Sequence, residues 1–240
     1  LSVFILIYLF LTVCGTQGKG RERISFNRNW RFALTEKQAD ASAPGTDDSN
    51  WRILDLPHDW SIESDFSLDN PATPGGGSLP GGTGWYRKHF KLPESDKGKV
   101  IYIDFDGVYR NSEVWLNGHL LGFRPNGYVS FRYDLTPYLN YGKKENVLVV
   151  QADNSDQPNS RWYSGSGIYR NVWLVKTGQV HVDNWGTNIT TPVINADKST
   201  VEIETTLKND ASDVTVEVST LIQDKEGKIL YRISSPAEIA

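Results

Sequence analysis

The sequence lacks several features whose absence excludes whole classes of protein. Its 240 residues include one Cys and no Met, so the chain holds neither an internal disulfide scaffold nor a cysteine-ligated metal cluster. The four His are scattered without metal-ligand spacing, and we expect no metal or other cofactor. The formal net charge is only −4, whereas a nucleic-acid or anionic-membrane partner requires a basic face.

Long hydrophobic runs are scarce as well. The run LSVFILIYLFLTV over residues 1–13 is too short to span a bilayer and fits the hydrophobic region of a secretory signal. Cys14 follows directly, which predicts a lipoprotein signal with an acylated thiol, although Val13 stands where Gly, Ala or Ser is usual. The alternative is an ordinary secretory signal with Cys14 removed or unimportant. Both predict a signal segment at residues 1–18 and an exported protein, periplasmic or held at the outer membrane as a lipoprotein.

What the chain does contain is short segments of alternating apolar and polar residues. From Ile24 onward we find no convincing helical pattern, and helix should stay below the roughly one-third that globular domains average. Strands of this length, separated by Gly, Asn, Asp and Pro and rich in aromatics, predict an antiparallel β-sandwich. The clearest are residues 100–105, 112–116, 129–133, 146–151 and 171–175.

The turns have sequence signatures of their own. Asn117-Gly118 predicts a tight hairpin, because this dipeptide supplies the positive φ angles that such a turn needs, and Asn126-Gly127 predicts the same. Residues 71–84 hold six Gly and three Pro and predict a long mobile loop. This loop lacks the Gly-Lys-Ser/Thr ending of a phosphate-binding loop, so we exclude that function.

The composition of the sequence changes near residue 180: Trp and Arg become rare, and Thr, Val, Glu and Ile become frequent. Alternating strands at residues 200–205 and 214–219, with a hairpin-like break near Asn209, predict an immunoglobulin-like sandwich over 180–240, after a first domain at 22–179. This second sandwich stops after about 60 residues, whereas such a domain needs roughly 100. The short second sandwich predicts truncation at the C-terminal end, which should leave unpaired strand edges in that domain. Residue 1 is Leu rather than Met, which predicts truncation at the N-terminal end. We therefore expect a fragment that is truncated at both ends.

Four patches have an unusual mixture of Trp, Tyr, Arg, Asn and Gly: residues 56–60, 84–88, 106–118 and 160–170. Their order and spacing closely resemble the N-terminal sugar-binding domain of glycoside hydrolase family 2, and most of all the exported β-galactosidases of Bacteroides-type bacteria. The resemblance covers about residues 22–240. It implies a jelly-roll sandwich of the galactose-binding type, then an immunoglobulin-like domain, then a (β/α)₈ barrel with two catalytic glutamates.

Three of these patches allow both a structural and a functional interpretation. His58 and Asp59 either hydrogen-bond the backbone of a turn while Trp60 fills the core, or the three present polar groups and a flat ring to a ligand. Trp85 is either an anchor of the core or a ligand contact. The hairpin at residues 113–118 is expected to be structural, because its apolar side chains share one face.

The fourth patch favours carbohydrate binding. Arg161, Trp162 and Tyr163 place a fixed cation and two aromatic rings on a Gly-rich loop. Sugars bind to such a mixture, since an aromatic face covers the C–H side of the ring and planar donors reach the hydroxyls. Binding residues also collect on loops that a rigid sandwich supports. The alternative for Arg161 is a structural ion pair.

The resemblance adds a role for this loop, which in the family reaches the active site and contacts the non-reducing sugar. Some relatives carry Asp at the position of Arg161, and this sequence departs from that branch. A second family contact falls in the loop after Trp60, for which Asp69 or Asn70 is the best position. We therefore expect a carbohydrate substrate, a terminal β-galactoside or related sugar.

No catalytic residue is expected within this chain. Retaining glycosidases need two carboxyl groups, and in the family the acid/base Glu directly follows an Asn, a dipeptide that these 240 residues lack. Both carboxylates should lie in the missing barrel, the chain's partner within one protein. We therefore interpret the chain as an inactive N-terminal fragment of a retaining β-glycosidase for carbohydrate catabolism, best a β-galactosidase. The alternatives are a stand-alone carbohydrate-binding module, or a β-glucuronidase or β-mannosidase of the same family.

Overall fold

The computed structural model describes residues 6–13 by their backbone alone, and residues 20–35 and 41–239 with their side chains. It divides the chain into two compact units. Residues 23–97 and 101–176 form the larger one, called here the sandwich unit. The second unit comprises the described residues up to Glu22, residues 98–100, and those from Thr177 onward.

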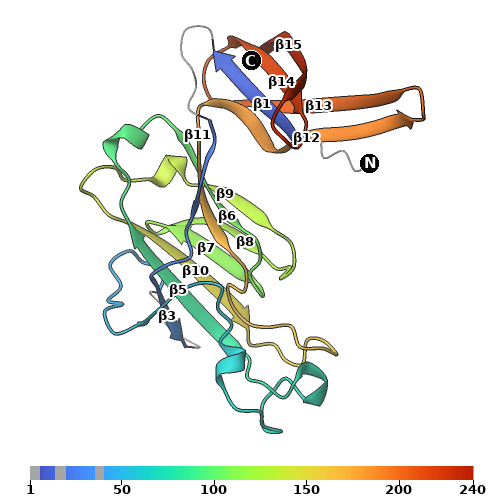
Figure 1. The fold of residues 1–240 in the computed structure, drawn as a ribbon. Helices are drawn as coiled ribbons and strands as arrows, with labels where there is room; N and C mark the ends of the chain where they lie inside the picture. The colour runs from blue at the N-terminus through green and yellow to red at the C-terminus, as the bar shows by residue number, and fades with distance from the viewer. Residues whose placement is uncertain (1–5, 14–19, 36–40, 240) are drawn as a thin grey trace. The chain divides into compact units, whose positions relative to one another are not determined.

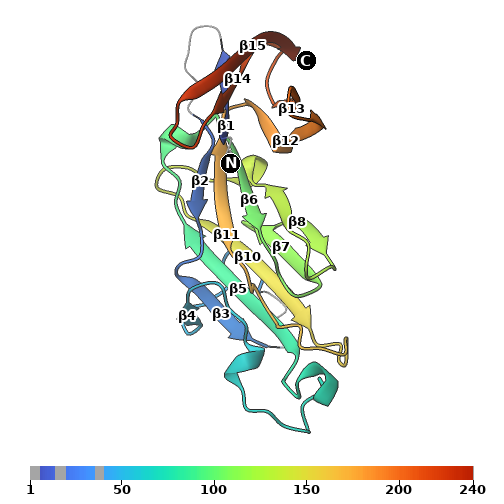
Figure 2. The ribbon, with the colours of Figure 1, turned by 45° about the vertical axis from the view of Figure 1, so that its right-hand side comes forward.

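The sandwich unit consists of two sheets that enclose one hydrophobic core (Figures 1 and 2). The first sheet has the order β4-β3-β5-β10-β7-β8 and the second has the order β2-β11-β6-β9. The strands of the first sheet are β3 (Trp30–Leu34), β4 (Arg52–Leu54), β5 (Gly82–Phe90), β7 (Ser112–Leu116), β8 (His119–Arg124) and β10 (Asn146–Asn154). Those of the second sheet are β2 (Glu22–Ser25), β6 (Val100–Phe105), β9 (Phe131–Asp134) and β11 (Val172–Thr177).

Alternation along the strands builds this core as the sequence predicts. Val114 and Leu116 of β7 are fully buried on its inner face, which confirms the structural interpretation of that hairpin. Tyr86 of β5 is also fully buried there. Its neighbour Trp85 points to the opposite face, where it stacks on Trp115 with ring centroids 5.7 Å apart. Trp85 is thus an anchor, but of a second, smaller core on the outer face of the sheet.

All the helices in the described part of the chain are short 3₁₀ turns, which confirms the all-β prediction. They are η1 (Ser61–Glu63), η2 (Pro74–Gly76), η3 (Glu94–Asp96) and η4 (Thr136–Tyr138). Among the described residues, none of the helices is long and apolar enough to cross a membrane. The Gly-rich segment at residues 71–84 contains η2 and then enters β5.

One of the two predicted Asn-Gly turns is confirmed and the other is wrong. Asn117 and Gly118 both have positive φ angles, 52° and 85°, and join β7 to β8 in a tight hairpin. Gly127 is absent from the residues of positive φ. It is needed for space instead, since a Cβ there would come within 2.2 Å of the Tyr109 ring. The segment around Gly127 joins strands of different sheets, β8 and β9.

The second unit is also built of antiparallel strands. A two-stranded sheet pairs β12 (Val180–Ile194) with β13 (Ser199–Asn209), and a three-stranded sheet has the order β1-β14-β15. Its strands are β1 (Leu6–Val13), β14 (Val214–Gln223) and β15 (Ile229–Ile239). The expected hairpin between β13 and β14 is wrong, because the two strands belong to different sheets. Strand β14 instead turns back into β15, and the turn is closed where Asp224 N–H donates to the Lys228 carbonyl over 3.0 Å.

Strand β1 lies within the predicted signal segment. Its backbone pairs with β14 from Leu6 opposite Gln223 to Val13 opposite Val216. An apolar run rich in aromatic and β-branched residues has the composition of a strand as well as of a signal, and β14 offers it an edge. The predicted lipidation site, Cys14, lies outside the described residues. Export and lipidation therefore stay predictions.

Candidate functional site

The candidate site is built from loops of the sandwich unit, and the turn before η1 forms its base. Oδ1 of Asp59 accepts hydrogen bonds from the backbone N–H of Ser61 (3.0 Å) and of Ser166 (2.9 Å). Trp60 is 2% exposed and belongs to the core, and its indole N–H donates to the Gly81 carbonyl over 3.2 Å. The structural interpretation of this patch is confirmed for Asp59, which holds backbone N–H groups, and for Trp60, which fills the core. It is wrong for His58, whose side chain bonds other side chains instead of the backbone of the turn.

The side chain of His58, the residue before Asp59, takes part in a network of hydrogen bonds. Its Nδ1 lies 2.8 Å from the buried hydroxyl of Tyr86, and its Nε2 lies 2.8 Å from an Arg52 nitrogen and 3.2 Å from Glu63. Burial lowers the pKa of His58 below its ordinary value, against the opposing charge of Glu63. A neutral ring fits this geometry, because Nε2 then accepts from Arg52 while Nδ1–H donates to Tyr86. His58 thus ties β4, η1 and β5 together.

The loop at residues 159–167 carries the three predicted sugar contacts. Arg161 is exposed, and among the described residues its side chain makes no hydrogen bond or ion pair. Trp162 is 61% exposed, and its indole N–H donates to the Tyr128 hydroxyl over 3.1 Å. Tyr163 is 42% exposed and donates its hydroxyl to Oδ2 of Asp59. Burial and this acceptor raise the pKa of Tyr163 above its ordinary value, so the phenol stays a donor.

Two glycines allow the loop at residues 159–167 to lie against the turn that contains Asp59. Gly165 has φ +78° and Gly167 has φ +115°, conformations that side-chain-bearing residues rarely adopt. A Cβ on Gly165 would stand 3.0 Å from Oδ2 of Asp59, and one on Gly167 would stand 2.2 Å from the Tyr86 hydroxyl. Glycine is therefore required here by conformation and by space.

A chain of polar side chains fixes the same loop from the other side. The hydroxyl of Ser166 accepts from Ser61 (2.7 Å) and from the amide of Asn154 (2.8 Å). Oδ1 of Asn154 in turn accepts from Gln157 (3.0 Å) and Asn159 (2.6 Å). Ser166 and Asn154 are both buried. The loop is thus held in one conformation before any ligand binds.

A small open pocket lies between this loop and the Gly-rich segment. Trp162 and Tyr163 line it together with Ala72, Leu79, Asn159 and Ser164. Arg161 is absent from the lining, although a Cβ on Gly75 would lie 3.9 Å from its Cα. The structure therefore brings Trp162 and Tyr163 to one pocket, with Arg161 at the adjoining surface.

Asp69 and Asn70 lie in the loop before the Gly-rich segment. The amide of Asn70 donates to the carbonyls of Ser78 (2.9 Å) and Asp65 (3.3 Å), so it closes its own loop. Asp69 is exposed. Within the part of the chain that the structure describes, no hydrogen bond or ion pair joins either residue to the three predicted sugar contacts. Their role in sugar binding stays a prediction.

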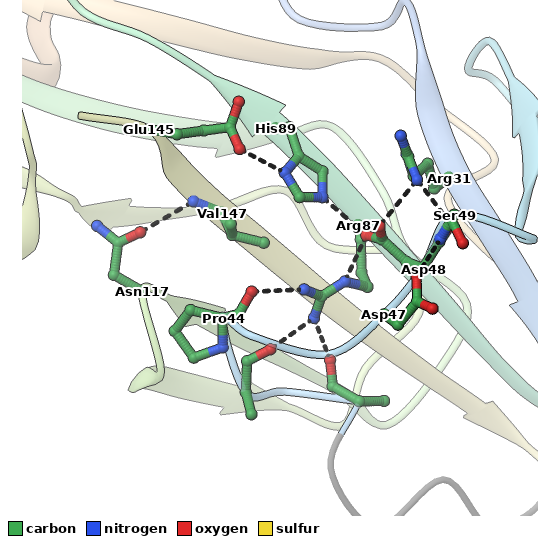
Figure 3. Close-up of polar contacts among 12 residues, drawn as sticks. Arg31, Pro44, Asp47, Asp48, Ser49, Arg87, His89, Asn117, Glu145 and Val147 are labelled. Carbon is green, nitrogen blue, oxygen red and sulfur yellow. Dashed lines mark hydrogen bonds and ion pairs between the residues drawn. The ribbon is translucent and has the colours of Figure 1, made fainter. Parts of the chain in front are cut away.

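Sequence reasoning missed a buried ionic cluster on the outer face of the first sheet (Figure 3). Arg87 is fully buried, and it donates to Asp48 over 2.7 Å and to three backbone carbonyls of residues 41–44. Asp48 also accepts from Arg31 (2.9 Å) and faces His89 Nε2 (2.7 Å). Glu145 lies 3.0 Å from the other His89 nitrogen. Burial opposes ionisation of Asp48, but the bonds from His89 and Arg87 outweigh it and lower its pKa.

This cluster fastens the segment that covers the sheet rather than forming a ligand site. Ala41 and Trp51, at the two ends of the covering segment, pack on Trp85 and Val149 of the smaller core. The signal for it in the sequence was Arg87, a charged residue two positions after Trp85, because residues two apart in a strand share one face. An ionised group at such a position requires a buried partner.

Comparisons with known proteins place this geometry in a family. Residues 24–178 match the family model described as "Glycosyl hydrolases family 2, sugar binding domain". The chain is 53% identical over 219 residues to the β-galactosidase BoGH2A of Bacteroides ovatus, which covers 91% of this chain and 26% of that protein. It is 31% identical over 232 residues to a β-glucuronidase of Formosa agariphila, covering 88% of this chain and 23% of that protein.

A solved structure agrees with the sequence matches. A glycosyl hydrolase family 2 member from Bacteroides cellulosilyticus superimposes with a TM-score of 0.85 at 37% identity, over 91% of this chain and 29% of that one. The chain thus spans about a quarter of the length of the curated relatives it matches. The family resemblance inferred from the four patches is confirmed.

Proposed function

We propose, from the premise that the chain belongs to glycosyl hydrolase family 2 through its sugar-binding domain, that it forms one wall of the substrate pocket of a longer, exported β-galactosidase. The observation that carries the proposal is the loop at residues 159–167. It presents an exposed Arg161 without a protein partner among the described residues, beside the exposed rings of Trp162 and Tyr163. The 53% identity to a protein named β-galactosidase supports the choice of sugar.

The residues of this wall have separate tasks in the proposal. The guanidinium of Arg161 is a rigid fork of donors, suited to adjacent hydroxyl oxygens of the terminal sugar. The ring of Tyr163 covers the apolar side of the terminal sugar, and Trp162 continues the same wall beside it. The Asp59 carboxylate holds Tyr163 in place by accepting a hydrogen bond from the Tyr163 hydroxyl. The two carboxyl groups of a retaining mechanism, one acid/base and one nucleophile, belong to the rest of the longer protein.

The identity of the sugar is tested on the full-length protein with a panel of aryl glycosides. We expect kcat/KM on the β-galactoside to exceed that on the β-glucuronide and the β-mannoside. The β-glucuronidase among the relatives makes glucuronide the second candidate, because an unpaired Arg also binds a carboxylate. A higher kcat/KM on the glucuronide would replace the proposed sugar.

The gene downstream of residue 240 tests the larger proposal. A barrel with an Asn-Glu pair supports an enzyme, whereas an immediate stop codon supports a stand-alone carbohydrate-binding module. Export is tested separately by labelling cells with a fatty-acid analogue. Incorporation that Cys14→Ser abolishes supports a lipoprotein, and secretion without label supports an ordinary signal.

A further inference from the structure

Two exposed aromatic rings from different loops are joined by a hydrogen bond. The indole N–H of Trp162 donates to the hydroxyl of Tyr128 over 3.1 Å, and the two side chains are 61% and 52% exposed. The next residue, Tyr163, bonds Asp59 and lies near Gly77 of the Gly-rich segment, whose Cβ would come within 3.6 Å of its ring. Trp162 and Tyr163 therefore engage two different neighbours of the loop.

Tyr128 is held by its surroundings despite its exposure. Its backbone N–H donates to the Asn126 side chain over 2.8 Å. Its ring meets the buried Tyr109 edge-to-face, with centroids 5.4 Å apart and planes at 64°. The neighbouring Gly127 packs on the same Tyr109 ring, and its carbonyl accepts from Tyr169 over 2.9 Å. A ring fixed in this way loses little conformational entropy when it binds a ligand.

The chemistry of the pair suits a carbohydrate. Both rings offer exposed apolar surface, while the indole N–H is already satisfied by Tyr128. The Tyr128 hydroxyl accepts that bond, so its own hydrogen is left to donate to a ligand oxygen. A pair with apolar faces and a polar edge binds a group that is apolar on one side and hydroxylated at its rim, which describes a pyranose.

We propose that Trp162 and Tyr128 form an aromatic platform for a second sugar residue of the substrate, next to the terminal sugar. The pocket is lined by Trp162 and Tyr163 but not by Tyr128, so the platform continues the aromatic surface beyond the pocket. The inference rests on the proposed function, because it presumes that the terminal sugar lies at Arg161 and Tyr163. Tyr128 then contributes to the platform in two ways: its own ring contacts the sugar, and its hydroxyl orients Trp162.

The test compares two substrates of the full-length protein that share a terminal sugar. Methyl β-galactoside lacks a second ring, whereas β-1,4-galactobiose has one, and the readout is the ratio of kcat/KM on galactobiose to that on the methyl glycoside. We expect Tyr128→Ala to lower this ratio about 5- to 30-fold, the factor for a stacking contact of about 1–2 kcal/mol. Tyr128→Phe should lower it about 2- to 10-fold, because the indole loses the acceptor that orients it.

Controls separate this inference from the proposed function and from misfolding. Phe123→Ala removes another exposed ring of the same unit, 52% exposed, and should leave the ratio at the wild-type value. Arg161→Ala should lower kcat/KM on both substrates by one factor and leave the ratio unchanged. Should Tyr128→Ala fail to fold, Tyr128→Phe, which keeps the ring, decides the outcome. A ratio that stays at the wild-type value in a folded Tyr128 variant overturns the platform while the proposed function stands, and no hydrolysis of methyl β-galactoside by the wild type overturns both.

Discussion

Tyr163 donates its phenolic hydroxyl to the Asp59 carboxylate, although 104 residues separate the two in the chain. The other oxygen of the same carboxylate accepts the backbone N–H groups of Ser61 and Ser166. One side chain therefore joins the turn before η1 to the loop that carries the candidate sugar contacts. This link makes the position of Tyr163 depend on a residue that need not touch the ligand.

Removal of this carboxylate should destabilise the sandwich unit. Asp59→Ala leaves two backbone N–H groups and one hydroxyl without an acceptor, at about 1–3 kcal/mol for each such group when buried. We expect a loss of about 2–4 kcal/mol in the free energy of unfolding, and a smaller loss for Asp59→Asn, which keeps one acceptor oxygen. Urea unfolding followed by Trp fluorescence measures it, because every Trp except Trp185 lies in the sandwich unit. Asp65→Ala, an exposed carboxylate in the same region, is the control, and an equal loss there would contradict the role of Asp59.

Arg161 should contribute to sugar binding and little to stability. A hydrogen bond from a charged group contributes about 1.5–3 kcal/mol, so Arg161→Ala in the full-length enzyme should lower kcat/KM roughly 10- to 150-fold. The melting temperature should stay near the wild-type value, since the side chain is exposed. A structural ion pair predicts the opposite, a lower melting temperature with normal kinetics, and normal kinetics in a folded variant would exclude the sugar contact.

Local patterns predicted the parts of this fold that depend on neighbouring residues. Alternation located the strands, and Asn117-Gly118 located a hairpin, because side-chain period and turn conformation are set within a few residues. The same reasoning was wrong at Asn126-Gly127, where Gly is required by the ring of Tyr109 rather than by a positive φ. It was also wrong for the hairpin after Asn209, since four residues there carry the chain from one sheet to another.

The residue types of the candidate site could be predicted from the sequence, but the side chains that hold those residues in place could not. Arg, Trp and Tyr on a Gly-rich loop indicated sugar binding. The acceptor of Tyr163, the partner of Trp162 and the buried carboxylate beside Arg87 come from segments that only the sheet topology brings together. Such pairs leave no trace in local spacing. A buried Arg in a strand indicates that a buried acidic partner exists, but the local sequence does not identify which residue that partner is.

The chain by itself should not hydrolyse glycosides. A retaining mechanism requires an acid/base and a nucleophilic carboxyl group, and the family's Asn-Glu dipeptide is missing from this sequence. Residues 20–240, purified from a host without β-galactosidase, should release no aryl group from an aryl β-galactoside above a heat-inactivated control. Turnover by such a preparation would place the catalytic carboxylates within these residues.

Gly167 should tolerate no larger residue. Its φ of +115° disfavours any side chain, and a Cβ would meet the Tyr86 hydroxyl at 2.2 Å and the Trp60 ring at 3.0 Å. Because both partners are buried and fixed, Gly167→Ala should cost at least about 2 kcal/mol, from backbone strain of about 1–3 kcal/mol together with overpacking of similar size. Thermal unfolding of the chain measures the change. Gly45→Ala is the matched control, since nothing lies within 4 Å of its Cβ position, and an equal shift in both variants would contradict the steric argument.

The cluster at Asp48 should make the stability of the sandwich unit depend on pH. Asp48 lies among Arg31, Arg87 and His89. Burial raises its pKa, but the hydrogen bonds and charges of His89 and Arg87 outweigh burial and hold the pKa below the ordinary value of 3.8. Since the pKa is lower in the folded state, the stabilisation is fully present above the pKa of the unfolded chain, about 3.9. It is lost as the pH falls through the folded pKa.

Asp48→Asn tests this dependence. At pH 7 the variant should lose roughly 3–5 kcal/mol, the usual result when one partner of a buried ion pair is removed, because Arg87 is then left as a buried cation facing neutral groups. The difference between wild type and variant should shrink as the pH falls below about 4, since the wild type then protonates the same carboxyl. Urea unfolding at a series of pH values measures both free energies, with Asp65→Asn as the control for a solvent-exposed carboxylate. A difference that stays constant between about pH 6 and pH 2.5 would mean that Asp48 acts by its shape alone.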